Sequence, residues 1–452
     1  FEEFCSFYKM MSTRRDLYLL MLTYSNHKDH LDTDDITRFL ETEQKVNMCF
    51  HCVNEKLLKQ FYFFLGFTNY MRSPAGDIFN PEHYNVNQDM TQPLCNYFIA
   101  SSHNTYLMGD QLMSQSRVDM YAWVLQAGCR CVEVDCWDGQ DGEPIVHHGY
   151  TLTSKILFKD VIETINKYAF IKTDYPVILS IENHCSVLQQ KKMAQYLVEI
   201  LGDKLDVSSV KAEESGRLPS PESLRGKILV KVKALSDLVK YTCSVANCSW
   251  QVSSLSETKA HQLMQQKAAS FILFNQRQLS RIYPSSYRVD SSNFNPQPLW
   301  STGCQLVALN YQSEGRVLQL NRAKFYSNGN CGYILKPACM CVGLFRKCSF
   351  RQFTLDLHVL RHLSTSSQWI IDPFVEVEII GLPVDCCKEQ TRVVDDNGFN
   401  PMWEETLVFT VHMPELALVR FLVWDHDPIG QDFIGQRTIA FHSMMPGRNQ
   451  KR

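Results

Sequence analysis

The sequence predicts a multidomain α/β protein with a helical region, a split (β/α)8 barrel of the TIM type and a C-terminal antiparallel β-sandwich. Its 452 residues allow about three domains. In the middle of the chain, β-type runs alternate with helical segments, which is typical of a parallel sheet. Near the C-terminus the pattern changes to strands separated only by turns, which favours a sandwich.

The helical region comes first. Apolar residues recur at helical spacing from Phe1 to about Glu55, as in "RRDLYLLMLTY" and "DDITRFLETEQ". Turn-forming residues then cluster at 73–76 and 79–81 and mark a linker, so we assign residues 1–88 to this region. The chain begins at Phe1 rather than at a methionine, and we expect further sequence upstream.

The barrel follows in two parts, residues 89–235 and 253–345. The first part contains five predicted strands, "NYFIASS", "CRCVEVDCW", "PIVHHGY", "PVILSIENH" and "GKILVKVK", with "DVIETINKYAF" and "VLQQKKMAQYLVEILGD" as helices between them. The second part adds "ASFILFN", "LSRIYP" and "GCQLVALNY". Eight strands indicate a closed barrel. A polar stretch at 236–252 interrupts it as a short linker.

The last part, residues 346–452, reads as an all-β sandwich. Its predicted strands are "FTLDLHVL", "PFVEVEIIG", "TLVFTVH" and "LVRFLVWD", in which apolar and polar residues alternate.

Composition excludes several classes of protein. A net charge of −3 and a pI near 6.6 argue against a nucleic-acid binder that works through bulk positive charge. The 17 cysteines form no disulfide framework and favour a reducing cytosol. Cys49-Phe50-His51-Cys52 lacks the second pair that a zinc site needs. No apolar run approaches the roughly 20 residues that span a bilayer.

Polar side chains gather where the predicted barrel strands end. In a parallel barrel these ends meet at one mouth, which carries the active site. The residues there are His103, Asn104, Glu133, Asp135, His147, His148, Glu182, Asn183, Lys231, Lys233, Arg281 and Tyr283. One such residue alone is more often structural, but chance does not readily place polar groups at the same position on six strands. His147 and His184 have no further support.

The residue types at this mouth point to metal-assisted phosphoryl chemistry. Carboxylate and amide oxygens without thiolates suit Ca²⁺ or Mg²⁺ rather than zinc. Two imidazoles on separate strands can act as acid, base or oxyanion stabiliser. The lysine and arginine cations attract phosphate groups.

Five stretches resemble the X and Y halves of the eukaryotic phosphoinositide-specific phospholipases C. These are "SSHNTYL", "GCRCVEVDCWDG", "HHGYTLTSKILF", "YPVILSIENHC" and "SRIYPSSYRVDSSNFNP", with the X match at about 92–235 and the Y match at about 253–340. The segments "KMMSTRRDLYLLMLTYSNHKDHL" and "FLVWDHDPIG" are most similar to the eta isozymes. The resemblance implies the split (β/α)8 barrel and explains its interruption.

The resemblance also implies roles for the residues at the strand ends. His103 and His148 match the two catalytic histidines, and Glu182 matches a Ca²⁺-bound carboxylate that serves as general base. The implied Ca²⁺ ligands are Asn104, Glu133, Asp135 and Glu182. The implied contacts to the 4- and 5-phosphates of the inositol ring are Lys231, Lys233, Ser254 and Arg281, with Tyr283 stacked on the ring.

The implied reaction is attack of the inositol 2-hydroxyl on the adjacent phosphodiester of phosphatidylinositol 4,5-bisphosphate. His103 stabilises the developing charge and His148 protonates the diacylglycerol leaving group. Water then opens the cyclic phosphate, which gives inositol trisphosphate and diacylglycerol. A glycerophosphodiester-type barrel would share the histidines and acids, but would not need the phosphate-binding cations.

The flanking regions resemble further family domains. "IIDPFVEVEI", "DDNGFNPMWEETLVFTV" and "LVRFLVWDHDPIGQDFIGQ" resemble a C2-type domain. The implied Ca²⁺ ligands of that domain are Asp372, Asn397, Asp425 and Asp427. The chain stops at "MPGRNQKR", so we expect a truncated sandwich edge. The family's pleckstrin-homology domain and first EF-hand lobe are not in the sequence.

The helical start resembles the second EF-hand lobe of the family. Its loop has Tyr24 and Lys28 where carboxylates should stand, and Asp29 where the turn requires glycine. We therefore expect a scaffold that binds no Ca²⁺.

The expected partner is a phosphoinositide lipid at a membrane surface, with no nucleic acid and with upstream regulators that the sequence does not identify. The expected location is the cytoplasm, at the inner face of the plasma membrane. Four apolar residues near the mouth, Leu112, Tyr150, Leu152 and Tyr287, could form a membrane-dipping ridge or simply pack in loops. A catalytically inactive scaffold and a Ca²⁺-dependent membrane adaptor are the competing functions.

The linker gives a testable prediction. The linkers of most family members are long, acidic and autoinhibitory, whereas residues 236–253 contain Asp237 as the only acid. We expect raised basal activity. An acidic family-type linker inserted between Ser236 and Ser253 should lower turnover on lipid vesicles, and unchanged turnover would contradict the prediction.

Overall fold

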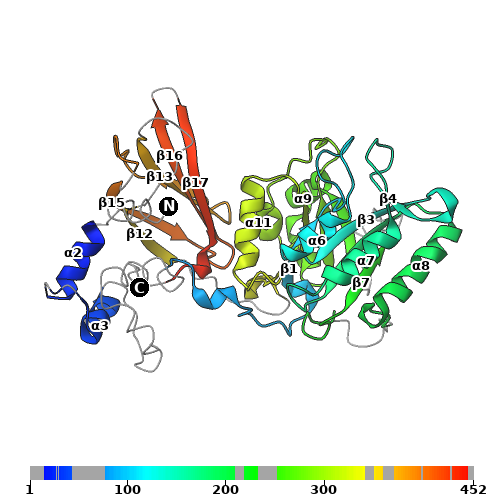
Figure 1. The fold of residues 1–452 in the computed structure, drawn as a ribbon, viewed down its shortest axis with the longest axis horizontal. Coiled ribbons are helices and arrows are strands. Elements are labelled where there is room, and N and C mark those ends of the chain that lie inside the picture. Colours follow the sequence, from blue (N-terminus) through cyan, green and yellow to red (C-terminus); the bar gives the residue numbers. More distant parts are fainter. Residues whose placement is uncertain are drawn as a thin grey trace, which may run out of the picture. The chain divides into compact units, whose positions relative to one another are not determined.

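The computed structural model describes residues 15–26, 28, 30–42, 77–208, 218–232, 252–341, 351–359, 371–398, 401–427 and 430–445. The chain divides into two compact units. One comprises Phe1–Glu82 together with Ser349–Arg452, and the other comprises His83–Cys348 (Figure 1). Cys49-Phe50-His51-Cys52, Asp29 and Lys233 lie outside the described residues.

The second unit is built on a curled parallel sheet. Its parallel strands lie in the order β7-β6-β3-β2-β10-β9-β8. Their bounds are β2 Ser101–Ser102, β3 Cys131–Trp137, β6 Val177–Asn183, β7 Ile228–Val232, β8 Val252–Ser256, β9 Leu279–Tyr283 and β10 Leu306–Leu309. Pairing between β7 and β8 is not found within the described ranges, but Lys231 Nζ on β7 donates to Ser254 Oγ on β8 over 2.6 Å. The sheet thus curls until its two edge strands meet through side chains, as the predicted split barrel requires.

Helices accompany the strands along the chain. They are α6 Asp119–Gln126, α7 Phe158–Tyr168, α8 Val187–Leu201, α9 Glu257–Asn275, α10 Gln297–Ser301 and α11 Arg316–Tyr326. Both helices predicted in the first half, α7 and α8, are confirmed. Helix α7 buries Phe158, Val161, Ile162 and Ile165, which is the spacing of a single apolar face. The short antiparallel pair β1 Tyr97–Ile99 and β11 Tyr333–Leu335 packs into the buried apolar cluster beneath the sheet.

Two predicted barrel strands are wrong. "ASFILFN" forms the C-terminal end of α9, because a short apolar run has the same appearance in a buried strand and in a helix. The strand in its place is β8, which begins at Val252, where the linker was predicted to end. "PIVHHGY" contributes β4 Ile145–Val146, which pairs antiparallel with β3 and with β5 Ile156–Leu157, outside the parallel order.

The first unit contains the predicted antiparallel sandwich. Strands β14 Cys387–Gln390, β13 Pro373–Ile380, β16 Leu418–Asp427 and β17 Gly430–Ala440 form one sheet in that order. Strands β12 Arg351–Val359 and β15 Met402–Val411 form the second. Along β15 buried and exposed residues alternate, and Trp403, Phe409 and Val411 join the core. The four strands predicted here are all confirmed.

A helical pair also belongs to this unit, α2 Arg15–Tyr24 and α3 Thr33–Thr42. At the start of α3 the backbone N–H groups of Asp32 and Asp35 each donate to the other's carboxylate, at 3.1 and 2.9 Å. Lys28 Nζ donates to Asp32 Oδ2 over 2.8 Å and so pairs with one of the acids of this loop. The scaffold role stays a prediction.

Short 3₁₀ segments complete the inventory: η2 Pro81–Tyr84, η3 Leu94–Asn96, η4 Gln140–Gly142, η5 Gly202–Lys204, η7 Ala338–Met340 and η8 Phe441–Ser443. Among the described residues, no helix is both long and apolar enough to cross a membrane.

The fully buried side chain of Arg130 gives a stability prediction. Its guanidinium donates to the carbonyl oxygens of Leu125 and Ala169, at the ends of α6 and α7, over 3.0 and 2.6 Å. Arg130→Met removes the side-chain donor to Ala169 and one of the donors to Leu125, whose oxygen still accepts from the backbone N–H of Gly128. A buried unpaired group costs about 1–3 kcal/mol, so we expect the barrel to lose about 2 kcal/mol of its free energy of unfolding.

Hydrogen exchange of the β3 and α7 amides would measure this loss. Arg117→Met is the matched control, because Arg117 and its partner Asp119 are both exposed, and it should change the free energy by less than about 0.5 kcal/mol. Equal exchange rates in the two variants would contradict the prediction.

Candidate active site

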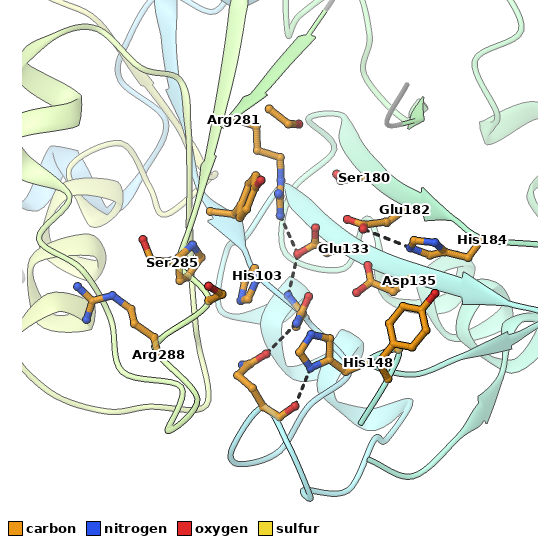
Figure 2. A pocket seen from close by; sticks show the side chains of 18 of the residues that line it. His103, Glu133, Asp135, His148, Ser180, Glu182, His184, Arg281, Ser285 and Arg288 are labelled. Atoms are coloured by element: carbon orange, nitrogen blue, oxygen red, sulfur yellow. Dashed lines mark hydrogen bonds and ion pairs between the residues drawn. The ribbon is translucent and has the colours of Figure 1, made fainter. Parts of the chain in front are cut away.

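A cavity of about 340 Å³ opens at the carboxyl ends of the parallel strands. Figure 2 shows part of its lining, with Glu133, Asp135 and Glu182 gathered between Arg281 and His148. Of the barrel residues predicted from the sequence to carry function, those that line this cavity are His103, Asn104, Glu133, Asp135, His148, Glu182, Lys231, Ser254, Arg281 and Tyr283. One patch of the barrel therefore brings all of them together except Lys233, which lies outside the described residues.

Strand register explains why these side chains meet. Asp135 on β3 lies beside Glu182 on β6 as a Cα partner. Ser180 on β6 has Lys231 of β7 as its partner, and Ser254 of β8 has Arg281 of β9. Partners in a parallel ladder point to the same face of the sheet. The ladder therefore groups acids on β3 and β6 and cations on β7 and β9.

The acids form a compact cluster. Glu133, Asp135 and Glu182 each offer a ligand atom, and these atoms lie within 4.8 Å of one another. Tyr106 Oη donates to Asp135 Oδ2 over 2.7 Å, whereas the buried Oδ1 of Asp135 has no hydrogen-bond partner among the described residues. Burial raises the pKa of Asp135 well above its usual range, and the nearby charges of Glu133 and Glu182 raise it further.

Asn104 completes the oxygen donors. Its backbone is left-handed, with φ of 37°, and its N–H donates to Glu133 Oε2 over 2.8 Å. The side-chain amide faces both acids, and one of its two end atoms lies 3.2 Å from Glu133 Oε2 and 3.3 Å from Asp135 Oδ2. With nitrogen in that place the amide would donate to the two carboxylates. With oxygen in that place it would join them as a ligand of a hard cation such as Ca²⁺.

Arg281 balances part of this negative charge. Its guanidinium lies 2.9 Å from Glu133 Oε2, and both side chains are buried. Burial raises the pKa of Glu133, but the charges of Arg281, His103 and Lys231 and the hydrogen bond from the Asn104 N–H together outweigh burial and hold that pKa at about 2. Glu133 is therefore an anion at neutral pH.

Both histidines are held through Nδ1. His148 Nδ1 lies 2.6 Å from the backbone oxygen of Gln111, and a carbonyl can only accept, so this nitrogen carries a hydrogen. His103 Nδ1 lies 2.8 Å from Asn310 Oδ1. Burial lowers the pKa of His103, against the opposing charge of Glu133. In each ring the Nδ1 contact leaves Nε2 available for a group bound in the cavity.

Four further residues at the site were missed by sequence reasoning. Ser180 and His184 line the cavity, and His184 stacks on Trp137 at 4.0 Å with Nε2 at 3.2 Å from Glu182 Oε1. Asn310 directly follows β10, so the strand-end rule could have found it. Gln111 lies in a loop without any distinguishing pattern.

The apolar residues predicted near the mouth are exposed. Tyr150 is 96% exposed, Leu152 78%, Tyr287 67% and Leu112 47%. The backbone N–H of Leu152 donates to the oxygen of Leu112 over 2.9 Å, which ties their loops together. Tyr150 also packs edge-on against the ring of Trp137, and the Tyr287 hydroxyl donates to Glu257 over 3.4 Å, so these two side chains combine exposure with loop contacts.

The acids of the sandwich meet only in part. Asp425 Oδ1 accepts from the backbone N–H of Asp372 over 2.8 Å, and Asp372 Oδ1 accepts from that of Asp396 over 2.7 Å. Burial raises the pKa of Asp425. Asn397 follows Asp396, and Asp427 ends β16. Within the described ranges, however, only the barrel acids gather three ligand atoms within 4.8 Å.

Comparison with known proteins agrees with this geometry. Family models for the X domain and the Y domain of phosphatidylinositol-specific phospholipase C match residues 90–234 and 230–339, and a C2 domain model matches residues 352–452. The crystal structure of PLC21 from L. pealei is similar with a TM-score of 0.81 and 32% identity, over 98% of this chain and 67% of that one. The chain belongs to the phosphoinositide-specific phospholipase C family.

Within the family the chain is similar to the eta type. It is 55% identical to human 1-phosphatidylinositol 4,5-bisphosphate phosphodiesterase eta-2 over 99% of this chain, and spans 45% of that protein's length. It is 39% identical to mouse inactive phospholipase C-like protein 2, again over 99% of this chain and 47% of that protein. The predicted family, fold and eta likeness are confirmed.

The acid cluster predicts a trade-off between stability and metal binding. Asp135→Asn replaces a carboxyl group whose ionisation is opposed by burial and by the charges of Glu133 and Glu182, so the metal-free barrel should gain about 1 kcal/mol of stability at neutral pH. The same variant should lose most of the stabilisation by Ca²⁺, which for an intact site is about 2.7 kcal/mol at 100 times Kd.

Hydrogen exchange of β3 and β6 peptides with and without Ca²⁺ measures both effects in the barrel alone. Asp141→Asn, in an exposed turn, is the control and should change neither. Full Ca²⁺ protection in Asp135→Asn would show that Asp135 is not needed to hold the metal and would contradict the prediction.

Proposed function

We propose that this chain is a Ca²⁺-dependent phosphodiesterase that cleaves phosphatidylinositol 4,5-bisphosphate to inositol 1,4,5-trisphosphate and diacylglycerol. The observation that carries the proposal is one cavity whose lining includes His103 and His148, three clustered acids and a group of phosphate-attracting cations. Acids alone would suit many metal enzymes, whereas the cations provide for a substrate with additional phosphates.

Charge separation within the cavity supports binding of the headgroup. We assign Lys231, Ser254 and Arg281 to the ring phosphates, and Lys233 to the same group from its sequence position. Lys231 Nζ already donates to Ser254 Oγ, so the two groups are held side by side. Tyr283, at the end of β9, is assigned to the face of the inositol ring.

The chain's own groups can move every proton that the reaction requires. The Glu182 side chain is 30% exposed, more than those of Glu133 and Asp135, so we assign it as the base that takes the proton of the 2-hydroxyl. That oxygen bonds to phosphorus, and the bond from phosphorus to the diacylglycerol oxygen breaks. His148, with hydrogens on both ring nitrogens, gives its Nε2 proton to the leaving oxygen and keeps the hydrogen on Nδ1. His103 stabilises the negative oxygen on phosphorus by donating from Nε2, which requires a hydrogen on both of its nitrogens.

The oxygen side chains of Asn104, Glu133, Asp135 and Glu182 are assigned to Ca²⁺. When bound, the ion supplies Lewis acidity that lowers the pKa of the attacking hydroxyl. Water then opens the cyclic phosphate, and the roles of Glu182 and His148 reverse.

The exposed apolar residues support action at a lipid surface. We propose that Leu112, Tyr150, Leu152 and Tyr287 dip into the inner face of the plasma membrane. We also assign Asp372, Asn397, Asp425 and Asp427 of the C2-type sandwich to Ca²⁺ that bridges to anionic lipid.

An inactive scaffold is the main alternative, since one similar protein is named as inactive. Such a scaffold has no need of the two histidines and the acids, yet this chain keeps both histidines and all three acids at the cavity. If the chain were only a membrane adaptor that acts through its C2-type domain, the clustered residues of the cavity would have no function.

Hydrolysis of phosphatidylinositol 4,5-bisphosphate in vesicles, followed against free Ca²⁺, tests the proposal. We expect turnover that requires Ca²⁺ and that falls by about 10²–10⁴-fold in His148→Ala, the range for loss of a general acid. His147→Ala is the control, because this neighbouring histidine does not line the cavity. Turnover that survives chelation or the His148 substitution would overturn the mechanism.

The ridge gives a separate prediction. Leu152→Ser should reduce turnover on vesicles about tenfold, because burying a leucine side chain is worth about 1.5–3 kcal/mol. Turnover of a soluble glycerophosphoinositol substrate should not change. Leu188→Ser on α8 is the matched control, since both leucines are 78% exposed. Equal effects of the two substitutions on vesicle turnover would contradict a specific contact between the ridge and the membrane.

A further inference from the structure

A buried glutamine, Gln111, contacts the site at two points. Its side-chain Oε1 accepts from Asn104 Nδ2 over 2.8 Å, and its backbone oxygen lies 2.6 Å from His148 Nδ1. Its backbone N–H donates to the oxygen of Val289 over 2.8 Å. The backbone contacts anchor the loop, whereas the side chain contacts a residue assigned to the metal.

The orientation of the Asn104 amide decides whether it can be a ligand. Its oxygen faces Glu133 and Asp135 at 3.2 and 3.3 Å. The reversed amide would direct NH₂ at the same two carboxylates and form hydrogen bonds with them. In the absence of a cation the reversed orientation is the more favourable one locally, and it offers the metal no oxygen.

Gln111 opposes this reversal. Because its Oε1 can only accept, it requires the nitrogen of Asn104 to face it and therefore leaves the oxygen facing the acids. A reversed Asn104 would bring its oxygen against Oε1, so two acceptors would meet without a hydrogen between them.

A second layer fixes the orientation of Gln111 itself. Its Nε2 donates to Ser291 Oγ over 2.8 Å and lies 3.4 Å from Asn310 Oδ1. Asn310 cannot turn freely, because its Nδ2 donates to the oxygen of Ser292 over 3.2 Å while its Oδ1 meets His103 Nδ1. A reversed Gln111 would bring its oxygen against Asn310 Oδ1.

We propose that Gln111 is a positioning residue that selects the metal-binding orientation of the Asn104 amide, itself held by Ser291 and Asn310. The proposal rests on the proposed function in one respect, namely that Asn104 is a ligand of the catalytic Ca²⁺. It adds a residue that touches neither the metal nor the substrate but sets the affinity for the metal.

Gln111→Met tests the proposal, because it removes the amide with little change of size and keeps both backbone contacts. All variants carry Asp425→Asn and Asp427→Asn, so that Ca²⁺ binding by the sandwich does not obscure the barrel site. Calorimetric titration with Ca²⁺ should show binding weakened at least tenfold by Gln111→Met, as is usual for loss of a supporting contact.

Gln312→Met is the matched control. Gln312 Nε2 lies 3.3 Å from Ser291 Oγ and 3.2 Å from the oxygen of Gly109, so it shares the same layer without touching Asn104. We expect the Ca²⁺ affinity of the Gln312→Met variant to stay within about twofold of that of the parent chain, because the contacts that hold the metal ligands are unchanged.

A double-mutant cycle isolates the mechanism. Asn104→Asp has two like oxygens and no nitrogen, so its orientation needs no selection. In this background Gln111→Met should cost less than about twofold in Ca²⁺ affinity, although it costs at least tenfold with Asn104 present. An equal cost in both backgrounds, or no cost with Asn104, would overturn the proposal.

Hydrolysis of lipid by the parent chain separates this inference from the proposed function. If the parent chain hydrolyses phosphatidylinositol 4,5-bisphosphate with Ca²⁺ but Gln111→Met binds Ca²⁺ normally, only the positioning role fails. If the parent chain binds no Ca²⁺ at the barrel and hydrolyses nothing, the proposed function fails as well.

Discussion

The crowding of three carboxylates in one buried corner of the barrel governs the rest of the site. Register between β3 and β6 places Asp135 beside Glu182, and the burial of Glu133 and Asp135 limits the screening of this charge by water. Arg281 at Glu133, the Tyr106 hydroxyl at Asp135 and His184 at Glu182 offset part of it. A site with three carboxylates this close together is suited to a divalent cation.

The cations of the cavity answer the same constraint. Lys231 and Ser254 join the two edge strands across the seam of the barrel, where the described residues show no backbone pairing. The seam therefore provides positive charge near the acids. A substrate with one phosphodiester and further ring phosphates is negative at both ends. Its ring phosphates can meet the cations directly, whereas its phosphodiester is repelled by the acids until a metal ion compensates them, so occupation by metal and by substrate should be linked.

Much of this could be predicted from the sequence, because polar residues at the ends of apolar strands are visible in a single chain. His103, Glu133 and Glu182 were found in that way. Register, which makes neighbours of Asp135 and Glu182, requires the folded sheet. The run "ASFILFN" was assigned wrongly since tertiary packing, not local pattern, decides between a buried strand and a helix. Gln111 could not be found, because a loop glutamine carries no periodic signal and its role depends on contacts 180 and 199 residues away.

The central claim is that a cation must compensate the acids before phosphate can bind near them. Calorimetric titration of soluble inositol 1,4,5-trisphosphate into the chain tests this claim most directly. The measurement needs no membrane and no turnover. We predict clear binding in Ca²⁺ that weakens at least tenfold when the ion is chelated, a coupling of about 1.4 kcal/mol or more. Equal affinity with and without Ca²⁺ would contradict the account.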